Sequence, residues 1–330
     1  MLPGYEEYFA FDASDEGLHT PGPQSNWNES CLFHLVEADG GAAWLIRIGR
    51  RVNEKYAEVT VMELRSDGST ALFIKREPIS GHSSWGVAGL DFTNLQPLKT
   101  WNAKFSGQVS EIERGEALSD PKQAFSSAKK VSCDFDLKFE DIVPVFGAYP
   151  GGGYAGGQRH YEGIHRCSGR VTIDGKQRIV TGFGFRDHSW GVRDWHQIEH
   201  WRWCFGQIDA ENVFSIVAIQ QEGPRHVYGV AVRNGKIHFV NNMTNESEYT
   251  TDGNFYLERI RMQCQLDGDI IDTRFKVKCR VPLRHKKGEM VLRIVENLAD
   301  VEIDGVPAVG WIEVADRIVD GRPVGIAAGD

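Results

Sequence analysis

The sequence lacks the features by which several classes of protein are recognised. No apolar run approaches the roughly 20 residues that span a bilayer, and residues 1–7 show no basic and apolar signal pattern. The six cysteines form no C-x-x-C pair, and a chain of 330 residues does not need disulfides, so we expect a reduced, cytoplasmic protein. Basic residues occur only in short runs. The net charge of −9 argues against nucleic acid or an anionic membrane as partner.

Signatures of phosphate, hydrolase and metal sites are also missing. The glycine-rich stretch 147–157 lacks a Gly-Lys-Ser/Thr ending and a following helix, so we expect a surface loop whose Tyr154 closes over a ligand. No Gly-x-Ser-x-Gly elbow occurs. The histidines between 160 and 200 include no His-Glu-x-x-His pair. We therefore expect no metal, although pairing of neighbouring strands could still bring three histidines together.

What the sequence does contain is a repeated alternation of apolar and polar residues. A period of two is typical of antiparallel strands that place one face on a core. The clearest such segments are 133–140, 260–266 and 275–281. Asp-Gly and Asn-Gly pairs at 67–68, 234–235 and 304–305 are typical of hairpin turns. Helical periodicity is limited to one or two turns within 116–129, so the chain is predicted to be all-β.

A faint internal repeat indicates two similar units. Val171–Gly175 and the strand pattern after it resemble Val301–Gly305 and the pattern that follows there. Two copies of a β-rich unit explain the match, and a chance similarity of hairpins is the alternative. A chain of this length also exceeds one ordinary domain. We expect an N-terminal domain over 1–195 and a C-terminal domain over 196–330.

The junction of these units carries the densest chemistry in the chain. Residues 183–203 hold four of the nine tryptophans, together with three histidines, three acidic residues and three arginines. If 183–190 is a strand, Asp187 points to one face, while Arg186, His188 and Trp190 point to the other. Asp187 and His188 are then not a dyad, and we expect His188 and Trp190 on the ligand side. A buried Asp187 would suit a general acid, and a structural ion pair is its alternative.

A second group follows directly. Glu199 and His200 lie beside Trp201 and Trp203, which places an acid and an imidazole next to aromatic rings. Such rings could stabilise a developing carbocation by about 0.5–2 kcal/mol per contact. Ordinary core packing is the alternative for each tryptophan.

The segment Asp187-His-Ser-Trp-Gly191, preceded by an Asp-Gly hairpin and followed by Trp201-Arg-Trp203, resembles a known family signature. The signature that it resembles is the Asp-His-x-Trp-Gly motif of the lipocalin-like hydroxyneurosporene synthase (carotenoid 1,2-hydratase) superfamily, which includes kievitone-hydratase-like proteins and fungal pericyclases. A closer resemblance is to uncharacterised bacterial two-domain proteins with an early Asn-Glu motif, here Asn28-Glu29.

The resemblance implies two tandem lipocalin-like antiparallel β-barrels packed together, no organic cofactor, and an apolar substrate such as an isoprenoid or polyketide. The hydratases are held to protonate a carbon–carbon double bond and to capture the cation with water. By this match, His188 and Trp190 fall on the positions that line the family's site. The further catalytic aspartate of the family has no counterpart in the segment 214–220, which carries no acid.

The resulting hypothesis is a cofactor-independent enzyme, a lyase (hydratase) or an isomerase/cyclase, acting on an apolar small molecule by acid/base chemistry at a double bond or ring. The alternatives are a non-catalytic carrier for a hydrophobic ligand and a metal-dependent lyase. The candidate catalytic residues are Asp187, His188, Glu199 and His200. The candidate substrate-binding residues are Glu29, Tyr154, Arg186, Trp190, Trp201 and Trp203. A homodimer is left open.

Overall fold

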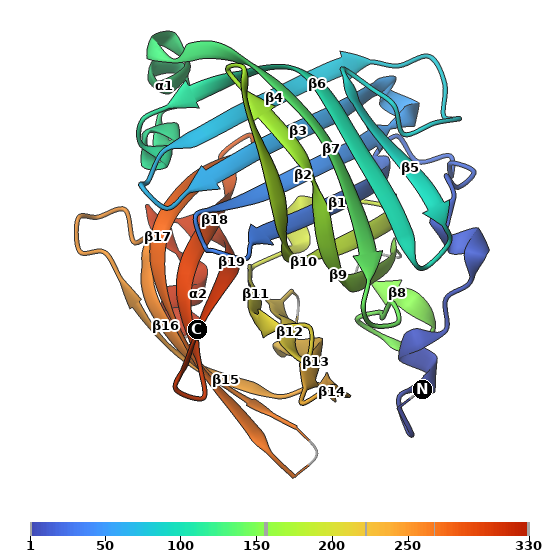
Figure 1. Cartoon of the computed structure of the whole chain (residues 1–330), viewed down its shortest axis with the longest axis vertical. Helices are drawn as coiled ribbons and strands as arrows, with labels where there is room; N and C mark the ends of the chain where they lie inside the picture. The colour runs from blue at the N-terminus through green and yellow to red at the C-terminus, as the bar shows by residue number, and fades with distance from the viewer. Residues whose placement is uncertain (1, 155–157, 222, 267, 329–330) are drawn as a thin grey trace.

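The computed structural model describes residues 2–154, 158–221, 223–266 and 268–328, while the side chains of Tyr154, His196, Ala327 and Ala328 lie outside its described part. Two large antiparallel sheets make up most of the molecule, one from each half of the chain. In Figure 1 the first sheet, coloured blue to green, lies above the second, coloured yellow to red. The prediction of an all-β chain is confirmed.

The first sheet closes on itself. Its order is β10-β1-β2-β3-β4-β6-β7-β9-β8, and β10 pairs with β9 as well as with β1. Its strands are β1 (Trp27–Glu37), β2 (Ala42–Arg51), β3 (Tyr56–Arg65), β4 (Thr70–Pro78), β5 (Leu90–Gln96), β6 (Thr100–Ile112), β7 (Lys129–Asp141), β8 (Gly153–Tyr154), β9 (Gln158–Ile173) and β10 (Lys176–Val192). The pairings form a barrel filled by apolar side chains such as Phe33, Trp44 and Phe139.

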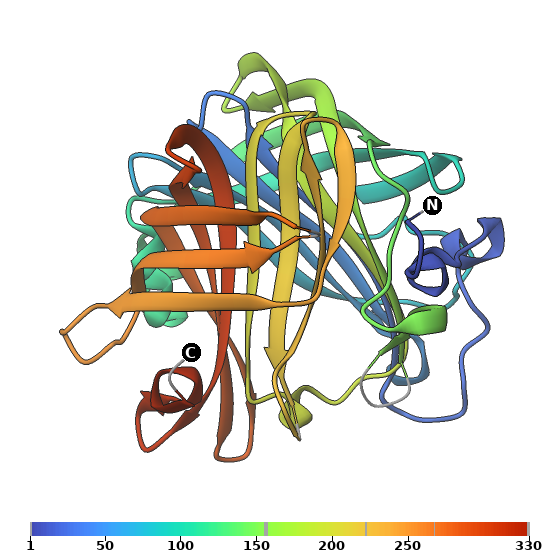
Figure 2. The same ribbon diagram turned by 90° about the horizontal axis from the view of Figure 1, so that it is seen from below.

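The second sheet has the order β14-β13-β12-β11-β19-β18-β17-β16-β15 and curls into a barrel-like shape, seen from below in Figure 2. Its strands are β11 (His200–Asp209), β12 (Asn212–Gln220), β13 (His226–Arg233), β14 (Lys236–Val240), β15 (Met243–Tyr249), β16 (Leu257–Gln265), β17 (Ile270–Lys287), β18 (Met290–Ile303), β19 (Val306–Val319) and β20 (Arg322–Pro323). The chain passes from one sheet to the other between Val192 and His200.

Helices are short and peripheral. The α-helices are α1 (Pro121–Ser127) and α2 (Val324–Ala328), and the 3-10 turns are η1 (Glu6–Phe9), η2 (Ala13–Glu16), η3 (Val52–Glu54), η4 (Gly115–Ser119), η5 (Pro150–Gly152) and η7 (Trp195–Gln197). The helix α1 begins where the Asp120 carboxylate accepts the backbone N–H of Gln123 and Pro121 takes the first turn. In the described part of the chain no helix has the length and hydropathy to cross a membrane.

The repeated Asp-Gly segments occupy equivalent places in the two sheets. Asp174-Gly175 joins β9 to β10, and Asp304-Gly305 joins β18 to β19. All four residues have positive φ, as two-residue hairpin turns require. In each sheet the second strand of this hairpin pairs with the first strand of the same sheet, β10 with β1 and β19 with β11. The internal repeat therefore has a topological counterpart.

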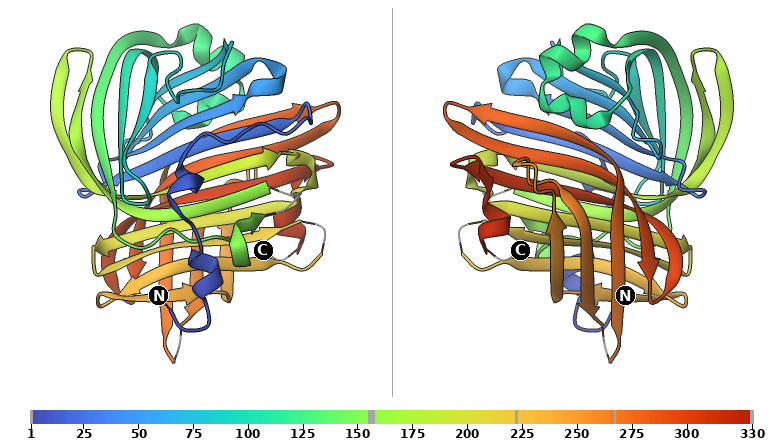
Figure 3. Two further views of the ribbon diagram at one scale, coloured as in Figure 1. Left: turned by 90° about the vertical axis from the view of Figure 1, so that its right-hand side faces the viewer. Right: turned by 90° about the vertical axis from the view of Figure 1, so that its left-hand side faces the viewer.

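The N-terminal segment contacts both sheets. Figure 3 shows it as a dark blue chain running along one side of the molecule. Tyr5 and Tyr8 pack on Phe239 of β14, with ring centroids 4.8 and 4.5 Å apart. Further along, Phe11 contacts Tyr161 of β9 at 5.2 Å. The segment thus covers one edge of the contact between the sheets.

Candidate functional site

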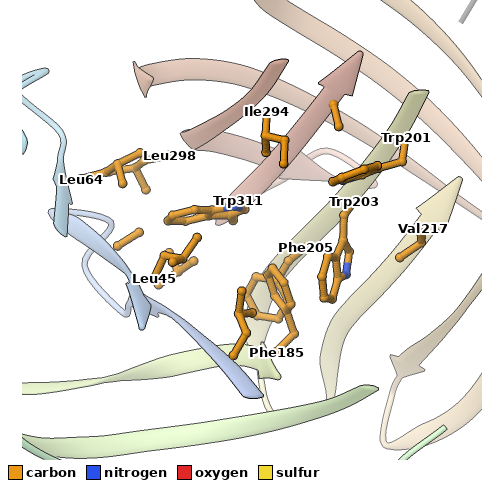
Figure 4. Close-up of a cluster of buried hydrophobic side chains, with 14 of the residues drawn as sticks. Leu45, Leu64, Phe185, Trp201, Trp203, Phe205, Val217, Ile294, Leu298 and Trp311 are labelled. Atoms are coloured by element: carbon orange, nitrogen blue, oxygen red, sulfur yellow. The ribbon is translucent and has the colours of Figure 1, made fainter. Parts of the chain in front are cut away.

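An apolar layer joins the outer face of the first barrel to one face of the second sheet. Phe185 of β10 meets Trp203 of β11 with ring centroids 4.4 Å apart, and Trp311 of β19 lies in the same layer. Figure 4 shows aromatic and aliphatic side chains from both sheets interdigitating here. Trp201, Trp203 and Phe205 all lie on this layer, because alternation along β11 puts them on one face.

The layer does not fill the whole contact, and a cavity of about 480 Å³ remains beside it. This volume is typical of small-molecule sites. Apolar wall residues come from both sheets, and they include Leu32, Leu45, Trp195, Trp201, Trp203, Val217 and Ile294. We call this space the inter-sheet cavity. Its inner wall also carries four carboxyl groups, from Glu162, Asp187, Glu296 and Glu313.

Asp187 faces this cavity from β10. Its side chain is 13% exposed, and its Oδ1 has no hydrogen-bond partner in the described part of the protein. The Nδ1 atom of His160 lies 3.9 Å from Oδ2. Burial raises the pKa of Asp187, because an apolar environment disfavours the charged form.

Glu162 of β9 lies nearby and is fully buried. Its Oε1 accepts hydrogen bonds from Tyr228 Oη at 2.6 Å and from His160 Nε2 at 3.2 Å. Burial raises the pKa of Glu162 to about 8. Burial also lowers the pKa of His160 to about 4, so a neutral imidazole faces a protonated carboxyl at neutral pH.

The remaining two carboxyls form a pair across the second sheet. Glu296 of β18 stands directly opposite Glu313 of β19. Burial, together with the neighbouring Glu313 charge, raises the pKa of Glu296 well above its usual value, and burial raises the pKa of Glu313 to about 7. The indole N–H of Trp311 donates to Glu296 at 3.0 Å, and that of Trp201 donates to Glu313 at 2.5 Å. Two carboxyls this close hold a shared proton, because both cannot ionise together.

A neutral histidine completes this corner. His34 of β1 has ligand-type atoms within 4.8 Å of those of Glu296 and Glu313. Its ring stacks on Phe185 at 4.0 Å, and burial holds its pKa well below the usual value. Neither ring nitrogen has a hydrogen-bond partner in the described part of the chain. The cavity wall therefore contains proton donors and potential acceptors, and the guanidinium groups of Arg47 and Arg193 line the same cavity.

The Glu296–Glu313 pair is not among the residues predicted from the sequence. The available signal was a glutamate at an inward position of two otherwise apolar patterns, Leu292-x-Ile294-x-Glu296 and Trp311-x-Glu313. Buried acids in such patterns are uncommon unless they have a partner. Their pairing could not be read without the register that sets the two strands side by side.

His188, in contrast, faces the interior of the first barrel. Its Nε2 lies 2.9 Å from Glu29 Oε1, and its Nδ1 lies 3.2 Å from the Tyr161 hydroxyl oxygen. His19 Nδ1 and His82 Nε2 also reach Glu29, at 2.7 and 2.8 Å. Burial works to raise the pKa of Glu29, but its close contacts with the three imidazoles hold that pKa below its usual value. We call these residues the histidine–Glu29 cluster.

Two further predicted ligand-binding residues lie on this inner face. Arg186 is fully buried and forms ion pairs with Glu16 at 2.8 Å and with Asp141 at 2.7 Å. Trp190 stacks on His19 with ring centroids 4.0 Å apart. Alternation along β10 correctly predicts that Asp187 and His188 point apart. The structure places Asp187 at the inter-sheet cavity and places His188 and Trp190 at the barrel interior, so the expectation that His188 and Trp190 meet a ligand stays a prediction.

The other predicted residues are distributed as follows. Trp201 and Trp203 line the cavity, and the Trp203 indole N–H donates to Ser215 Oγ at 2.9 Å. Glu199 forms an ion pair with Arg317 at 3.1 Å. His200 contacts Gln220 on the opposite face of β11, at 3.2 Å. The Tyr154 side chain lies outside the described part of the structure, so its expected contact with a ligand stays a prediction.

Comparisons with known proteins give a family and a shared fold. A family model described as "Domain of unknown function (DUF7064)" matches residues 12–318. No curated protein matches the chain. Several solved structures are similar over nearly their whole length, and we describe three of them.

The crystal structure of CghA has a TM-score of 0.57 and 13% identity, covering 94% of this chain and 96% of that chain. Kievitone hydratase from Nectria haematococca has a TM-score of 0.56 and 10% identity, covering 92% and 93%. A putative AttH from Nitrosomonas europaea has a TM-score of 0.56 and 13% identity, covering 96% and 99%. At these identities the likeness shows the fold, and the fold agrees with the two lipocalin-like barrels that the motif resemblance implies.

Proposed function

Because the chain belongs to the DUF7064 family, a domain of unknown function, we propose its activity from the chemistry of its own cavity. The proposed function is that of an enzyme that binds an apolar small molecule between the two sheets and performs acid/base chemistry at a double bond or ring. The observation that carries the proposal is the buried Glu296–Glu313 pair, which holds a proton beside the Trp201 and Trp203 rings.

The shared proton makes this pair the proposed general acid. A general acid works best when its pKa lies near the working pH, and the pKa of Glu313, raised by burial to about 7, meets that condition. Transfer of the proton to an alkene carbon leaves a cation on the neighbouring carbon. The π faces of Trp201 and Trp203 stabilise such a cation by about 0.5–2 kcal/mol per contact when it lies over a ring.

The cation can be discharged in two ways that balance atoms and charge. Water adds to it and loses a proton to a carboxylate of the cavity, which is hydration. Alternatively, a neighbouring C–H loses its proton to a carboxylate of the cavity, which is isomerisation. In cyclisation an internal double bond first attacks the cation, and the new cation then loses a C–H proton to such a carboxylate. Asp187, with an unpartnered Oδ1, is the proposed second acid/base group. These steps need an acid, a base and water, so the proposed reaction is independent of an organic cofactor.

The names of the structural neighbours support the same class of chemistry. Kievitone hydratase is called a hydratase, and CghA has been crystallised with Sch210972. A carrier would need only the apolar wall. Four buried carboxyls on that wall are costly to fold and contribute nothing to holding an apolar ligand, and this favours the enzyme over the carrier.

The test begins with native mass spectrometry of the purified protein, to identify a bound apolar molecule, followed by incubation of that molecule with the protein. Conversion supports the enzyme, and a molecule that is bound but unchanged supports the carrier. Glu313→Gln and Asp187→Asn should lower kcat, and Glu199→Gln, on a surface ion pair, serves as the matched control. We expect kcat to fall as pH rises through about 7, because the pKa of Glu313 is raised to about 7 by burial. Full turnover by folded Glu313→Gln and Asp187→Asn variants would refute the proposal.

A further inference from the structure

The histidine–Glu29 cluster lies outside the proposed chemistry, on the opposite face of β10 from the inter-sheet cavity. His19 Nδ1 and His188 Nε2 both point at one atom, Glu29 Oε1, at 2.7 and 2.9 Å. The ligand-type atoms of these three residues all lie within 4.8 Å of one another. Glu29 and His188 are fully buried, so the surrounding packing fixes the positions of these two side chains.

The hydrogen-bond inventory leaves one contact unexplained. Tyr161 has a single hydroxyl hydrogen, which it donates to Glu16 Oε1 at 2.7 Å. His188 Nδ1, 3.2 Å from the same hydroxyl oxygen, must then be the donor in that contact. A neutral His188 consequently presents the lone pair of Nε2 to a carboxylate oxygen, and two acceptors face each other unless a positive centre lies between them.

We propose that this positive centre is a divalent transition-metal ion bound by His19 Nδ1, Glu29 and His188 Nε2. Two imidazole nitrogens and one carboxylate suit Zn²⁺ and its first-row neighbours rather than Ca²⁺ or Mg²⁺, which take oxygen ligands. The site is independent of the proposed enzyme activity. Its role is structural, because it fastens the segment that carries His19 to the interior of the first barrel.

The geometry requires small movements. Metal–ligand bonds of about 2.0–2.1 Å place two ligand atoms about 2.9–3.4 Å apart. The two separations from Glu29 Oε1, 2.7 and 2.9 Å, need to open by only a few tenths of an ångström. His19 can make this adjustment, because it lies on a coil and its side chain is 23% exposed. The same exposure gives the ion a path from solvent.

Neighbouring groups orient the proposed ligands as outer-shell partners do at metal sites. Arg50 Nε donates to His82 Nδ1 at 3.0 Å, so His82 Nε2 carries a hydrogen and donates it to Glu29 Oε2 at 2.8 Å. His82 is therefore a positioning residue that turns the carboxylate toward the other two histidines. Trp190 holds the His19 ring from one side by stacking.

A second group of potential ligands, His34 with Glu296 and Glu313, is a weaker candidate. Its two carboxyls already share a proton, and each also accepts an indole N–H. We therefore assign the metal to the histidine–Glu29 cluster alone.

The experiment is a calorimetric titration of the chelator-treated full chain with Zn²⁺, complemented by the visible absorption spectrum of the Co²⁺ form. One ion should bind per chain and raise the melting temperature. His19→Gln and His188→Gln should weaken Zn²⁺ binding by about 100-fold or more, beyond the 10–100-fold typical of outer-shell partners. His226→Gln, on the second sheet, is the matched control and should bind as the unaltered chain does.

His19→Gln keeps the test valid if His188→Gln does not fold, since His19 lies on a partly exposed coil. The proposal is overturned if no stoichiometric Zn²⁺ binding occurs, which would leave a second proton on His188 as the positive centre. It is also overturned if binding persists in both histidine variants. Neither result bears on the cavity carboxyls, so the proposed enzyme activity stands or falls separately.

Discussion

Replacement of Glu162 by glutamine tests whether the cavity wall stores protonated carboxyls. Burial raises the pKa of Glu162 from 4.5 to about 8 in the folded protein. Between these values the folded state binds a proton that the unfolded state releases, so the free energy of unfolding falls as pH rises. Below pH 4.5 both states are protonated and the group costs nothing. The penalty reaches about 3 kcal/mol at pH 7 and about 5 kcal/mol above pH 8.

Glu162→Gln cannot ionise and is free of this penalty. The glutamine oxygen can still accept the Tyr228 hydroxyl, whereas its NH₂ takes the place of Oε2, which has no partner in the described part of the chain. An unsatisfied donor costs about 1–3 kcal/mol at every pH. The O–H that protonated Glu162 carries on Oε2 is an unpartnered donor of the same kind. The variant should therefore be close in stability to the unaltered chain near pH 5 and should gain about 1.4 kcal/mol relative to it per pH unit up to about pH 8.

Urea unfolding followed by tryptophan fluorescence at pH 5, 6, 7 and 8 measures this difference. Glu140→Gln is the matched control, because Arg166 holds the pKa of that partly exposed glutamate below its usual value, so its charge changes little between pH 5 and 8. Parallel stability curves for Glu162→Gln and the unaltered chain would refute the reasoning. Parallel curves would mean that Glu162 is ionised in the folded protein and that another contact offsets the effect of burial on its pKa.

Two further predictions concern packing. Gly184→Ala should lower the free energy of unfolding by about 3 kcal/mol or more, because a Cβ there overlaps the His34 carbonyl oxygen across the β1–β10 pairing. The control Gly81→Ala, whose Cβ meets open space, should change that free energy by no more than about 0.5 kcal/mol. Similar urea midpoints for the two variants would contradict the pairing. All six cysteines are free and buried. Dithionitrobenzoate should therefore label none of them rapidly in the native protein and all six after denaturation. A fast reaction with the native protein would contradict this burial.

The fold could be predicted from the sequence because its signals are local. Alternation at 133–140 predicts β7, and the Asp304-Gly305 turn predicts the β18–β19 hairpin, since each signal needs only neighbouring residues. The short helix within 116–129 was equally readable from Pro121 and its capping Asp120. Each of these elements was present where the pattern placed it.

The site could be predicted only in part, because it depends on how faces are packed. Both faces of β10 are largely buried, so alternation separates Asp187 from His188 but cannot say which face meets the second sheet. Glu296 and Glu313 lie on different strands, and only the register brings them together. His19 lies on a coil far from His188 in sequence, and no periodicity links a coil to a barrel interior.

The two-faced burial of β10 has a consequence for protein engineering. Odd-numbered positions from 183 to 189 face the second sheet and its cavity, while even-numbered positions from 184 to 190 face the barrel interior. A library at the odd positions would therefore explore the cavity wall and the contact between the sheets, and one at the even positions would explore the barrel interior. The period of two in this strand thus separates mutations that act between the sheets from mutations that act inside the first barrel.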